Sequence, residues 1–116
     1  MHYIDGFVVP VPTEQKEAYR ALCVQAAEVF KDYGALRVVE CWGQDVPAAP
    51  VTDFRRAVLA RADETVVFSW IVWPSKAVRD EGRARALKDP RLQPGQELPF
   101  DARRMLQGGF QVLADV

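Results

Sequence analysis

The chain has 116 residues, of which 49% are hydrophobic and 27% are charged. This composition is typical of a globular protein and excludes a disordered chain, and the length fits a single domain over residues 1–116 that buries a core without disulfides or metals. The formal net charge of −1 gives no support for nucleic-acid binding, because binding to phosphates usually requires a basic face. We therefore predict no nucleic-acid partner.

Three features of the sequence predict a cytoplasmic protein. The first six residues lack the charged and then apolar pattern of a signal peptide. No apolar run approaches the length of a membrane span, so no membrane partner is expected. The two cysteines, Cys23 and Cys41, match neither a CxxC pair nor a zinc-binding pattern, and we interpret them as reduced, buried thiols.

The N-terminal part of the chain is predicted to form a strand and then a helix. Residues 3–11 are rich in Tyr, Ile, Phe and Val, and we expect Pro10 and Pro12 to end this strand because proline cannot donate a ladder hydrogen bond. In the segment that follows, apolar residues recur at spacings of three or four, which indicates a helix. Thr13 is its expected N-cap and Gly34 its left-handed stop.

The rest of the chain is predicted to contain three strands and a second helix. Strands are expected at 35–42, 64–73 and 108–116, the second helix from Ser75 to about Lys88, and short helical turns after Asp53 and Asp101. Gly82 lies inside the second helix, where it costs on the order of 1 kcal/mol relative to alanine. The order predicts an α+β fold of the ferredoxin-like βαββαβ type, a four-stranded antiparallel sheet with both helices on one face.

The strand at 64–73 is apolar on both of its faces. Alternate residues of a strand point to opposite faces, and here both sets are apolar apart from Ser69. Two helices on one face leave the other uncovered, and monomers do not tolerate an exposed apolar face of this size. We therefore predict a homodimer in which this sheet face packs against a second copy of the chain. The competing interpretation is that the loop at 91–100 folds under the sheet and covers the face.

Three segments resemble the YbaA-like family of uncharacterised proteins, domain-of-unknown-function family 1428. They are the opening run 3–12, the strand 64–73, and the closing residues Pro99-Phe100-Asp101, Arg104-Met105 and Gly108-Gly109-Phe110. The resemblance implies a dimeric α/β-barrel, in which the sheet of each ferredoxin-like unit packs against its twin, and it implies no established activity. One departure is Gln107, since an aromatic residue often precedes Gly-Gly-Phe in that pattern.

Three polar residues, Asp5, Glu40 and Ser69, stand in otherwise apolar strands. If they share a face, they form a polar cluster inside a dry cavity, and Glu40 and Asp5 are then candidate catalytic carboxylates with a raised pKa suited to proton transfer. The alternative, which the sequence favours, is that Arg37 or Arg79 pairs with Glu40 and that the pair only stabilises the dimer.

Three tryptophans are candidates for the wall of an aromatic ligand pocket. Trp42, Trp70 and Trp73 lie in predicted strands, and Ser69 is a further candidate for contact with a ligand in such a pocket. Aromatic residues at strand spacing serve more often as core or interface residues, so this alternative stays open.

Two neighbouring arginines near the C-terminus are candidates for binding an anionic ligand. Arg103 and Arg104 follow Pro99-Phe100-Asp101, and a guanidinium group there suits an anion at the mouth of the barrel. The alternative is that both arginines pair structurally with Asp101 or Glu97.

Nucleophilic and metal-dependent chemistry have little support in the sequence. His2 is the single histidine and stands beside the N-terminus, so we predict no metal site, no cofactor and no Ser-His or Cys-His device. Cys41 neighbours Glu40, a carboxylate that is expected to raise the pKa of the thiol and so disfavours a reactive thiolate.

Our leading interpretation is a cytoplasmic homodimeric α/β-barrel protein of undetermined biochemical role. One alternative is a cofactor-free enzyme that resembles monooxygenases or isomerases and acts on a small aromatic substrate, and it rests on fold analogy alone. A second alternative is a small-molecule binding or stress-related protein that holds an apolar ligand. An enzyme requires Glu40 or Asp5 in a cavity open to solvent, whereas in a scaffold protein both would be sealed by arginine.

Overall fold

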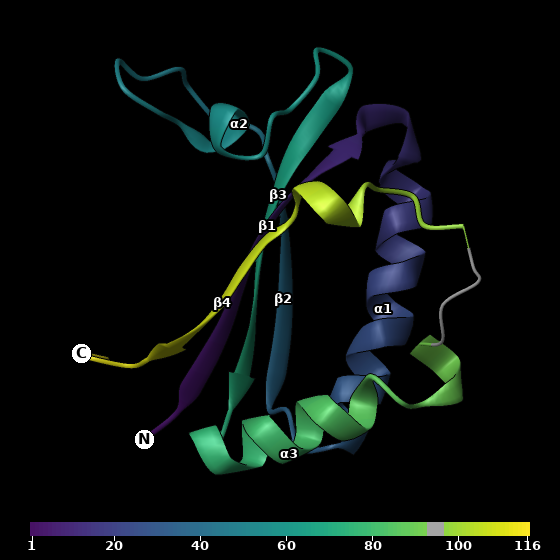
Figure 1. Cartoon of the computed structure of the whole chain (residues 1–116), viewed down its shortest axis with the longest axis vertical. Helices are drawn as coiled ribbons and strands as arrows, with labels where there is room; N and C mark the ends of the chain where they lie inside the picture. Colours follow the sequence, from purple (N-terminus) through teal and green to yellow (C-terminus); the bar gives the residue numbers. More distant parts are fainter. Residues whose placement is uncertain (93–96) are drawn as a thin grey trace.

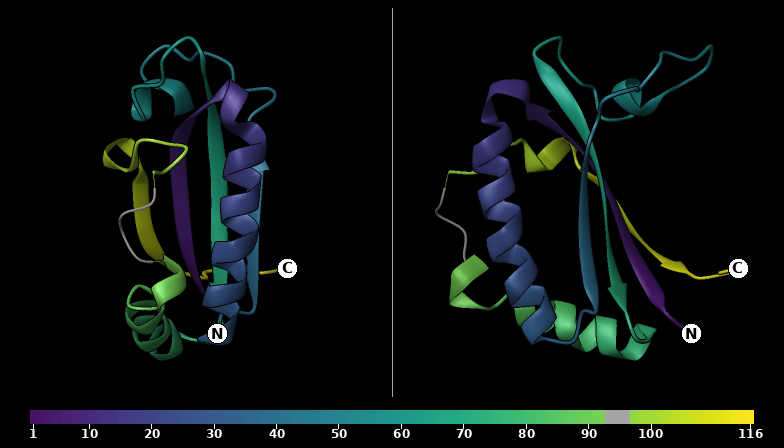
Figure 2. Two further views of the ribbon diagram at one scale, coloured as in Figure 1. Left: turned by 90° about the vertical axis from the view of Figure 1, so that its right-hand side faces the viewer. Right: turned by 180° about the vertical axis from the view of Figure 1, so that it is seen from behind.

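The computed structural model describes residues 1–92 and 97–116 of the chain. Its strands are β1 (Tyr3–Pro12), β2 (Arg37–Trp42), β3 (Glu64–Trp73) and β4 (Leu106–Gln111), and its α-helices are α1 (Lys16–Asp32), α2 (Phe54–Ala57) and α3 (Lys76–Ala86). The strands form one antiparallel sheet in the order β2-β3-β1-β4. This order confirms the predicted ferredoxin-like α+β fold. Figure 1 shows α1 and α3 on the same side of the sheet, and Figure 2 shows α1 running along the strands while α3 crosses one end of them.

The first strand continues through the two prolines that were expected to end it. Pro10 lies opposite Val66 and Pro12 opposite Glu64 in the pairing of β1 with β3. The pairing of β1 with β4 reaches only Val8, so beyond that residue one side of β1 needs no hydrogen-bond donor. Proline is tolerated in a strand where its missing N–H would face such an open edge.

The last strand is shorter than predicted, at Leu106–Gln111 instead of 108–116. Its final residue, Gln111, lies opposite Tyr3, the first residue of β1. No part of β1 therefore remains for residues beyond Gln111 to pair with, although their sequence is apolar enough for a strand.

Local capping chemistry explains where most of the helices begin. Ser75 and Asp53 cap α3 and α2 by accepting hydrogen bonds from the backbone N–H groups of Val78 and Arg56, as predicted. Thr13 is not the cap of α1: its hydroxyl hydrogen-bonds that of Thr65 at 2.7 Å, and a 3₁₀ turn at Thr13–Gln15 precedes the helix.

Two further 3₁₀ turns lie in the C-terminal part of the chain. Asp101 caps a 3₁₀ turn at Ala102–Arg104, as predicted, and another 3₁₀ turn lies at Pro90–Leu92. Gly34 has a φ of 114° and ends α1 in the left-handed region.

Within the described residues, no helix is long and apolar enough to cross a membrane.

The core lies between the sheet and its two helices. One cluster contains Val9, Val11, Tyr19 and Val67, and a second contains Ala35, Ile71 and Trp73. Trp73 is fully buried and meets Phe30 of α1 edge to face, with ring centroids 6.3 Å apart. The two clusters leave space between them, and the candidate site described below occupies it.

Much of the opposite face of the sheet is left uncovered by the described residues. Phe68 is 46% exposed and Phe110 is 59% exposed, and Val8, Trp70 and Val72 on the same face are partly exposed. The competing prediction placed the loop at 91–100 over this face. Residues 93–96 lie outside the described residues, and the flanking residues Leu92, Leu98 and Phe100 instead line a cavity on the helix side.

Candidate ligand-binding cavity

A cavity of about 550 Å³ lies between α1 and the inner face of the sheet. Its walls are mainly apolar and include Phe7, Val38 and Ile71 from the strands and Leu22, Ala26 and Phe30 from α1. Phe100 and Met105 also line it. The cavity exists because α1 presents small side chains to the sheet at Ala26 and Ala27, where a larger residue would fill the space.

The three polar residues singled out in the strands all line this cavity. Glu40 lies directly opposite Ser69 in the pairing of β2 with β3, and Asp5 lies opposite Ile71 in the pairing of β1 with β3. The prediction that Asp5, Glu40 and Ser69 share one face is therefore confirmed. The two carboxylates nevertheless have different partners, and this difference decides which of them is available to a ligand.

Asp5 is sealed by a cation and by an indole. Arg79 donates from Nη2 to Asp5 Oδ1 at 2.8 Å, and Trp73 donates from Nε1 to Asp5 Oδ2 at 2.9 Å. Asp5 is 2% exposed, so this ion pair is buried and its partners neutralise the charge. Asp5 therefore links β1 to α3 through its ion pair with Arg79.

Glu40 has no cation partner among the described residues. Tyr19 donates its hydroxyl proton to Glu40 Oε1 at 2.9 Å. The prediction that Arg37 or Arg79 pairs with Glu40 is wrong, because Arg79 binds Asp5. Arg37 lies opposite Val72 in the pairing of β2 with β3, on the other face of the sheet.

Glu40 is exposed to solvent, although protein atoms surround much of its carboxyl group. This partial removal from water raises the pKa of Glu40, while interactions with Tyr19, Ser69 and Cys23 act in the opposite direction. Glu40 is thus a carboxyl group that is open to a bound molecule and more easily protonated than usual.

Two residues of α1 complete the polar cluster and were missed by the sequence reasoning. Tyr19 and Cys23 are one helical turn apart and both face Glu40. Burial, and next the charge of Glu40, raise the pKa of Cys23 to about 12, and the same two causes raise the pKa of Tyr19. The signal in the sequence that could have identified them was their i, i+4 spacing beside the apolar stripe of the helix.

The thiol beside Glu40 belongs to Cys23, whereas the sequence had suggested Cys41. Adjacent residues of a strand point to opposite faces, so Cys41 is on the outer face of the sheet while Glu40 is on the inner one. Both cysteines are free thiols that are partly exposed, so the expectation that they are buried is only partly met.

The three tryptophans do not wall one pocket, and that prediction is wrong. Trp73 is fully buried beside Asp5, and Trp70 lies on the outer face of the sheet. Trp42 borders a second pocket of about 320 Å³ on the β2 side of α1, with the Lys16 ammonium group 5.5 Å from its ring centroid. This second pocket shares Glu40 with the main cavity.

The two arginines near the C-terminus are held by carboxylates. Arg104 makes a two-pronged pair with Glu64, with contacts of 2.6 and 2.7 Å, and also bonds Asp101 at 3.1 Å. Arg103 bonds Asp101 at 3.2 Å. The predicted alternative of pairing with Asp101 is confirmed, and neither arginine lines the main cavity.

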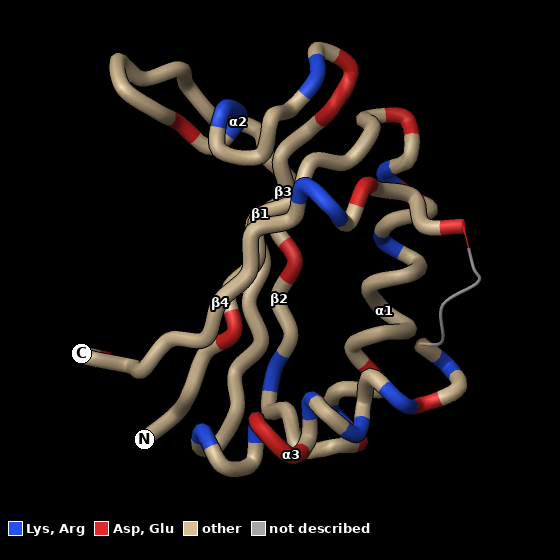
Figure 3. Tube along the Cα trace, viewed as in Figure 1, with Lys and Arg blue, Asp and Glu red and all other residues tan. Residues whose placement is uncertain are grey.

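Arg83 is the cation that the sequence reasoning did not single out. It lies on α3 and lines the cavity, and its Nη2 donates to the side-chain oxygen of Gln107 at 2.9 Å. Figure 3 shows that the strands carry few charged residues, whereas α3 carries many of both signs. The charge pattern of α3 alone therefore gave no reason to select Arg83.

Together these features define an α+β protein of ferredoxin-like topology with an apolar cavity that contains one accessible carboxyl group. The chain belongs to the family described as "Protein of unknown function (DUF1428)", whose model matches residues 2–102. It is 53% identical over 116 residues to the uncharacterized protein YbaA of Escherichia coli strain K12 and to that of Shigella flexneri, with 99% of each chain covered.

A solved structure shares the fold. The structure of Rv0793 from Mycobacterium tuberculosis matches with a TM-score of 0.51 and 15% sequence identity, over 99% of this chain and 98% of that one. At this identity the likeness concerns the fold alone. The family and the fold predicted from the sequence are therefore both confirmed.

Proposed function

We propose that the protein binds a small, largely apolar molecule in the cavity between α1 and the sheet, with Glu40 in contact with the bound molecule. The observation that carries this proposal is a cavity of about 550 Å³ with apolar walls and a carboxyl group that has no cation partner in the described chain. Ligand pockets typically have volumes of roughly 300–1,000 Å³ and combine apolar walls with a few polar groups.

The environment of Glu40 supports a role beyond structure. A scaffold would be expected to pair its inward carboxylates with arginine, as Asp5 is paired with Arg79. Glu40 instead keeps a raised pKa in a space that water reaches. A titratable group with a perturbed pKa in a cavity is typical of functional sites.

Acid–base catalysis on the bound molecule is the second candidate function. A carboxyl group with a raised pKa exchanges protons more readily near neutral pH, and Tyr19, Ser69 and Cys23 interact with it. A cofactor-free isomerase or monooxygenase that acts on a small aromatic substrate would use Glu40 in this way. Glu40→Gln separates the two functions, because a catalyst would lose turnover while the cavity still binds its ligand.

The proposal includes a homodimer formed through the outer face of the sheet. Along this face Val8 pairs with Phe68 and Ile4 with Phe110 across the strands, and Phe54 of α2 meets Phe68 edge to face at 6.1 Å. Figure 1 shows α2 and its loops extending from the side of the sheet opposite α1. A second copy of the chain is the simplest cover for such a face.

We further propose that the protein works in the cytoplasm. Both cysteines are free thiols that are partly exposed, which supports a reducing compartment.

Native mass spectrometry of protein purified from cells without added ligand tests the proposal. We expect twice the mass of the chain plus a small bound mass that is released on denaturation. Ala26→Phe is expected to abolish the bound mass by filling the cavity, whereas Ala21→Phe on the exposed side of α1 is expected to retain it. A bound mass that persists in Ala26→Phe would place the ligand outside the cavity and contradict the proposal.

A further inference from the structure

We infer that the ligand of this cavity carries an anionic group, such as a carboxylate, that binds the guanidinium group of Arg83 at the α3 end. The inference rests on the proposed binding function and adds the chemical class of the ligand: a small apolar molecule with one negative charge. It rests on Arg83 and on the groups packed around it.

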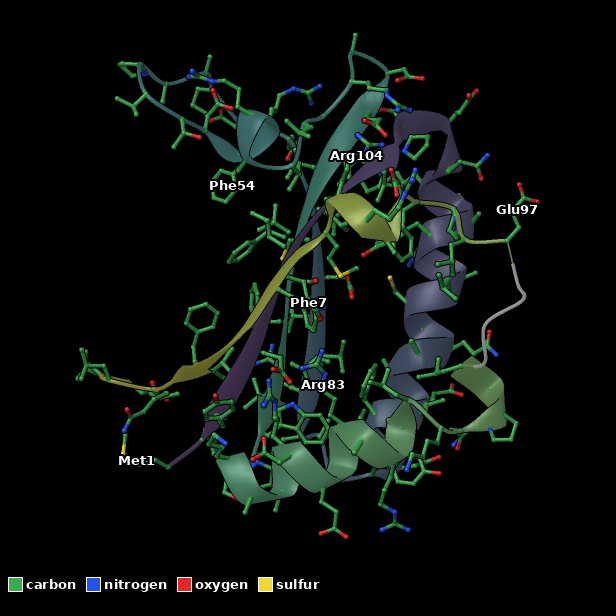
Figure 4. The ribbon with its side chains drawn as sticks, viewed as in Figure 1. Met1, Phe7, Phe54, Arg83, Glu97 and Arg104 are labelled. Atoms are coloured by element: carbon green, nitrogen blue, oxygen red, sulfur yellow. The ribbon has the colours of Figure 1, made fainter. Side chains whose placement is uncertain are left out.

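The position of Arg83 is set by the residue before it. A Cβ on Gly82 would lie 2.3 Å from the carbonyl oxygen of Tyr33 and 2.7 Å from the Trp73 ring, so α3 packs directly against the end of α1 and against β3. Gly82 is buried, and Arg83 beside it is partly buried and lines the cavity. Figure 4 shows Arg83 reaching from α3 toward the strands, on the side of the sheet where Phe7 lies.

The helix presents two arginines to the sheet, one turn apart, and only one of them has a carboxylate. Arg79 binds Asp5 through Nε and Nη2, and its Nη1 bonds Asp80 at 2.9 Å. Among the described residues, the hydrogen-bond partner of the Arg83 guanidinium group is the neutral amide of Gln107. The oxygens of Asp5 are already occupied by Arg79 and Trp73, so they cannot also neutralise Arg83.

The other arginine that lines the cavity is paired with carboxylates. Arg91, the second arginine that lines the cavity, pairs with Asp32 and Asp89 at 2.9 Å each. Arg83 has no ion pair with any described residue. The residues outside the described chain, 93–96, are Gln-Pro-Gly-Gln and carry no carboxyl group.

A guanidinium group in this position is suited to a carboxylate. It has five N–H donors in a planar fork, and one hydrogen bond to Gln107 leaves a pair of donors for a two-pronged contact with an anion. Beside apolar walls, the attraction between opposite charges is stronger than in open water. An anion bound there would supply the counter-charge that no described residue provides in direct contact with Arg83.

Glu40 is the second polar position in the cavity, and it is expected to determine the orientation of the ligand. Glu40 repels an anion when ionised, so the anionic group is expected at Arg83 and away from the cluster formed by Glu40, Tyr19 and Ser69. The apolar body then lies against the walls at Phe7 and Phe30. A neutral hydrogen-bonding group at the far end of the molecule would meet Glu40.

Calorimetric titration with matched neutral and anionic probes tests this inference on the full chain. The probes are 1-naphthaleneacetate with its amide, and octanoate with octanamide, so that each pair differs only in charge. We expect each carboxylate to bind about tenfold or more tightly than its amide, because a hydrogen bond to a charged group is stronger than one to a neutral group. Added salt is expected to weaken the binding of the carboxylates more than that of the amides.

Three variants assign the preference to one side chain. Arg83→Gln is expected to abolish the preference for the carboxylate and to leave the binding of the amide unchanged, while Arg83→Lys keeps the charge and part of the preference. Arg85→Gln is the matched control, since Arg85 is exposed on the same helix and lies near Glu81, and it is expected to behave like the wild type. Circular dichroism confirms that each variant is folded before titration.

The outcomes separate this inference from the proposed function. Equal binding of carboxylate and amide to the wild type, or a preference that survives Arg83→Gln, would overturn the anion inference and leave the cavity as a binding site. Failure of all four probes to bind would contradict the proposed function itself, and the inference with it.

Discussion

Two acidic residues on one sheet face, Asp5 and Glu40, have opposite surroundings and therefore different roles. Asp5 is buried and held by Arg79 and Trp73, and such a pair contributes to structure and is costly to break. Glu40 is held by a neutral tyrosine in a space that water reaches. The chemistry of the cavity is therefore expected to depend on Glu40, and pH is the variable that reveals it.

Glu40→Gln is expected to make the protein more stable at pH 7 relative to the wild type, with the difference narrowing on acidification. Burial raises the pKa of Glu40 above its ordinary value of 4.5. The stability it contributes is therefore fully present below pH 4.5 and is lost as pH rises through the raised pKa. Urea unfolding between pH 4 and pH 8 measures this difference. Tyr19, Cys23 and Ser69 face the carboxyl group, and all three are uncharged in this range.

Glu64→Gln is the control, for which we expect the opposite effect on stability at pH 7. The hydrogen bonds of Arg104 lower the pKa of Glu64, so its contribution to stability is present above its ordinary pKa and is lost as pH falls. This variant is expected to be less stable than the wild type at pH 7, with a smaller difference at pH 4. If both variants lowered stability at pH 7 alike, Glu40 would have a charged partner and our description of it would be wrong.

Cys23 is expected to react slowly with iodoacetamide in the folded protein at pH 8. Burial and the charge of Glu40 raise its thiol pKa to about 12, and the thiolate is the reactive form. Mass spectrometry of the Cys41→Ser variant follows Cys23 alone. Glu40→Gln is expected to speed the reaction, because the second cause of the shift is then removed. Equally fast labelling of the folded and urea-unfolded chains would contradict this expectation.

At the scale of elements, the sequence was sufficient to predict those helix starts that depend only on capping by a nearby side chain. Ser75, Asp53 and Asp101 cap the helical segments that they were predicted to cap. The order of strands and helices also followed, because the periodicity of apolar residues changes clearly between strand and helix.

Pairing between distant elements could not be predicted in the same way. The ends of β1 and β4 depend on how far their pairing extends, which nothing in either segment reveals. From the sequence, Arg79 could pair with either Asp5 or Glu40. The position of α3 across the end of the sheet brings it to Asp5. The cavity itself depends on the distance between α1 and the sheet, so Tyr19, Cys23 and Arg83 became candidates only in the structure.

Gly82→Ala is expected to destabilise the protein by roughly 2 kcal/mol or more, the range of a forced overpacking. In an isolated helix this change would be stabilising, but here the new Cβ would lie 2.3 Å from a backbone oxygen. Urea unfolding at pH 7 measures the effect. Ala84→Gly, at an exposed position of the same helix, is expected to cost only about 1 kcal/mol. A neutral or stabilising Gly82→Ala would show that α3 does not pack as closely as described.

At the scale of the molecule, the two faces of the sheet have different surroundings. The inner face holds the cavity, and the outer face presents partly exposed aromatic and aliphatic residues. In our proposal the outer face holds two chains together, while each chain keeps its own cavity. The proposed dimer would therefore cover the apolar face without occupying the cavity.

Phe68→Asp is expected to convert the dimer into a monomer. Phe68 is 46% exposed at the centre of the outer face, between Phe54 and Trp70, and a carboxylate there would be buried without a partner in the dimer. Analytical ultracentrifugation measures the mass. Val24→Asp, on the exposed side of α1, is expected to remain dimeric. A wild-type protein that sediments as a monomer would contradict the proposed assembly.

The most direct test of the central claim is the titration of a neutral apolar dye, N-phenyl-1-naphthylamine, into the wild type, Ala26→Phe and Ala21→Phe, followed by fluorescence. We predict saturable binding to the wild type and to Ala21→Phe, and its loss in Ala26→Phe, where the new ring occupies the space between α1 and the sheet. Binding to Ala26→Phe as tight as to the wild type, or no saturable binding to the wild type, would contradict the claim that this cavity is a binding site.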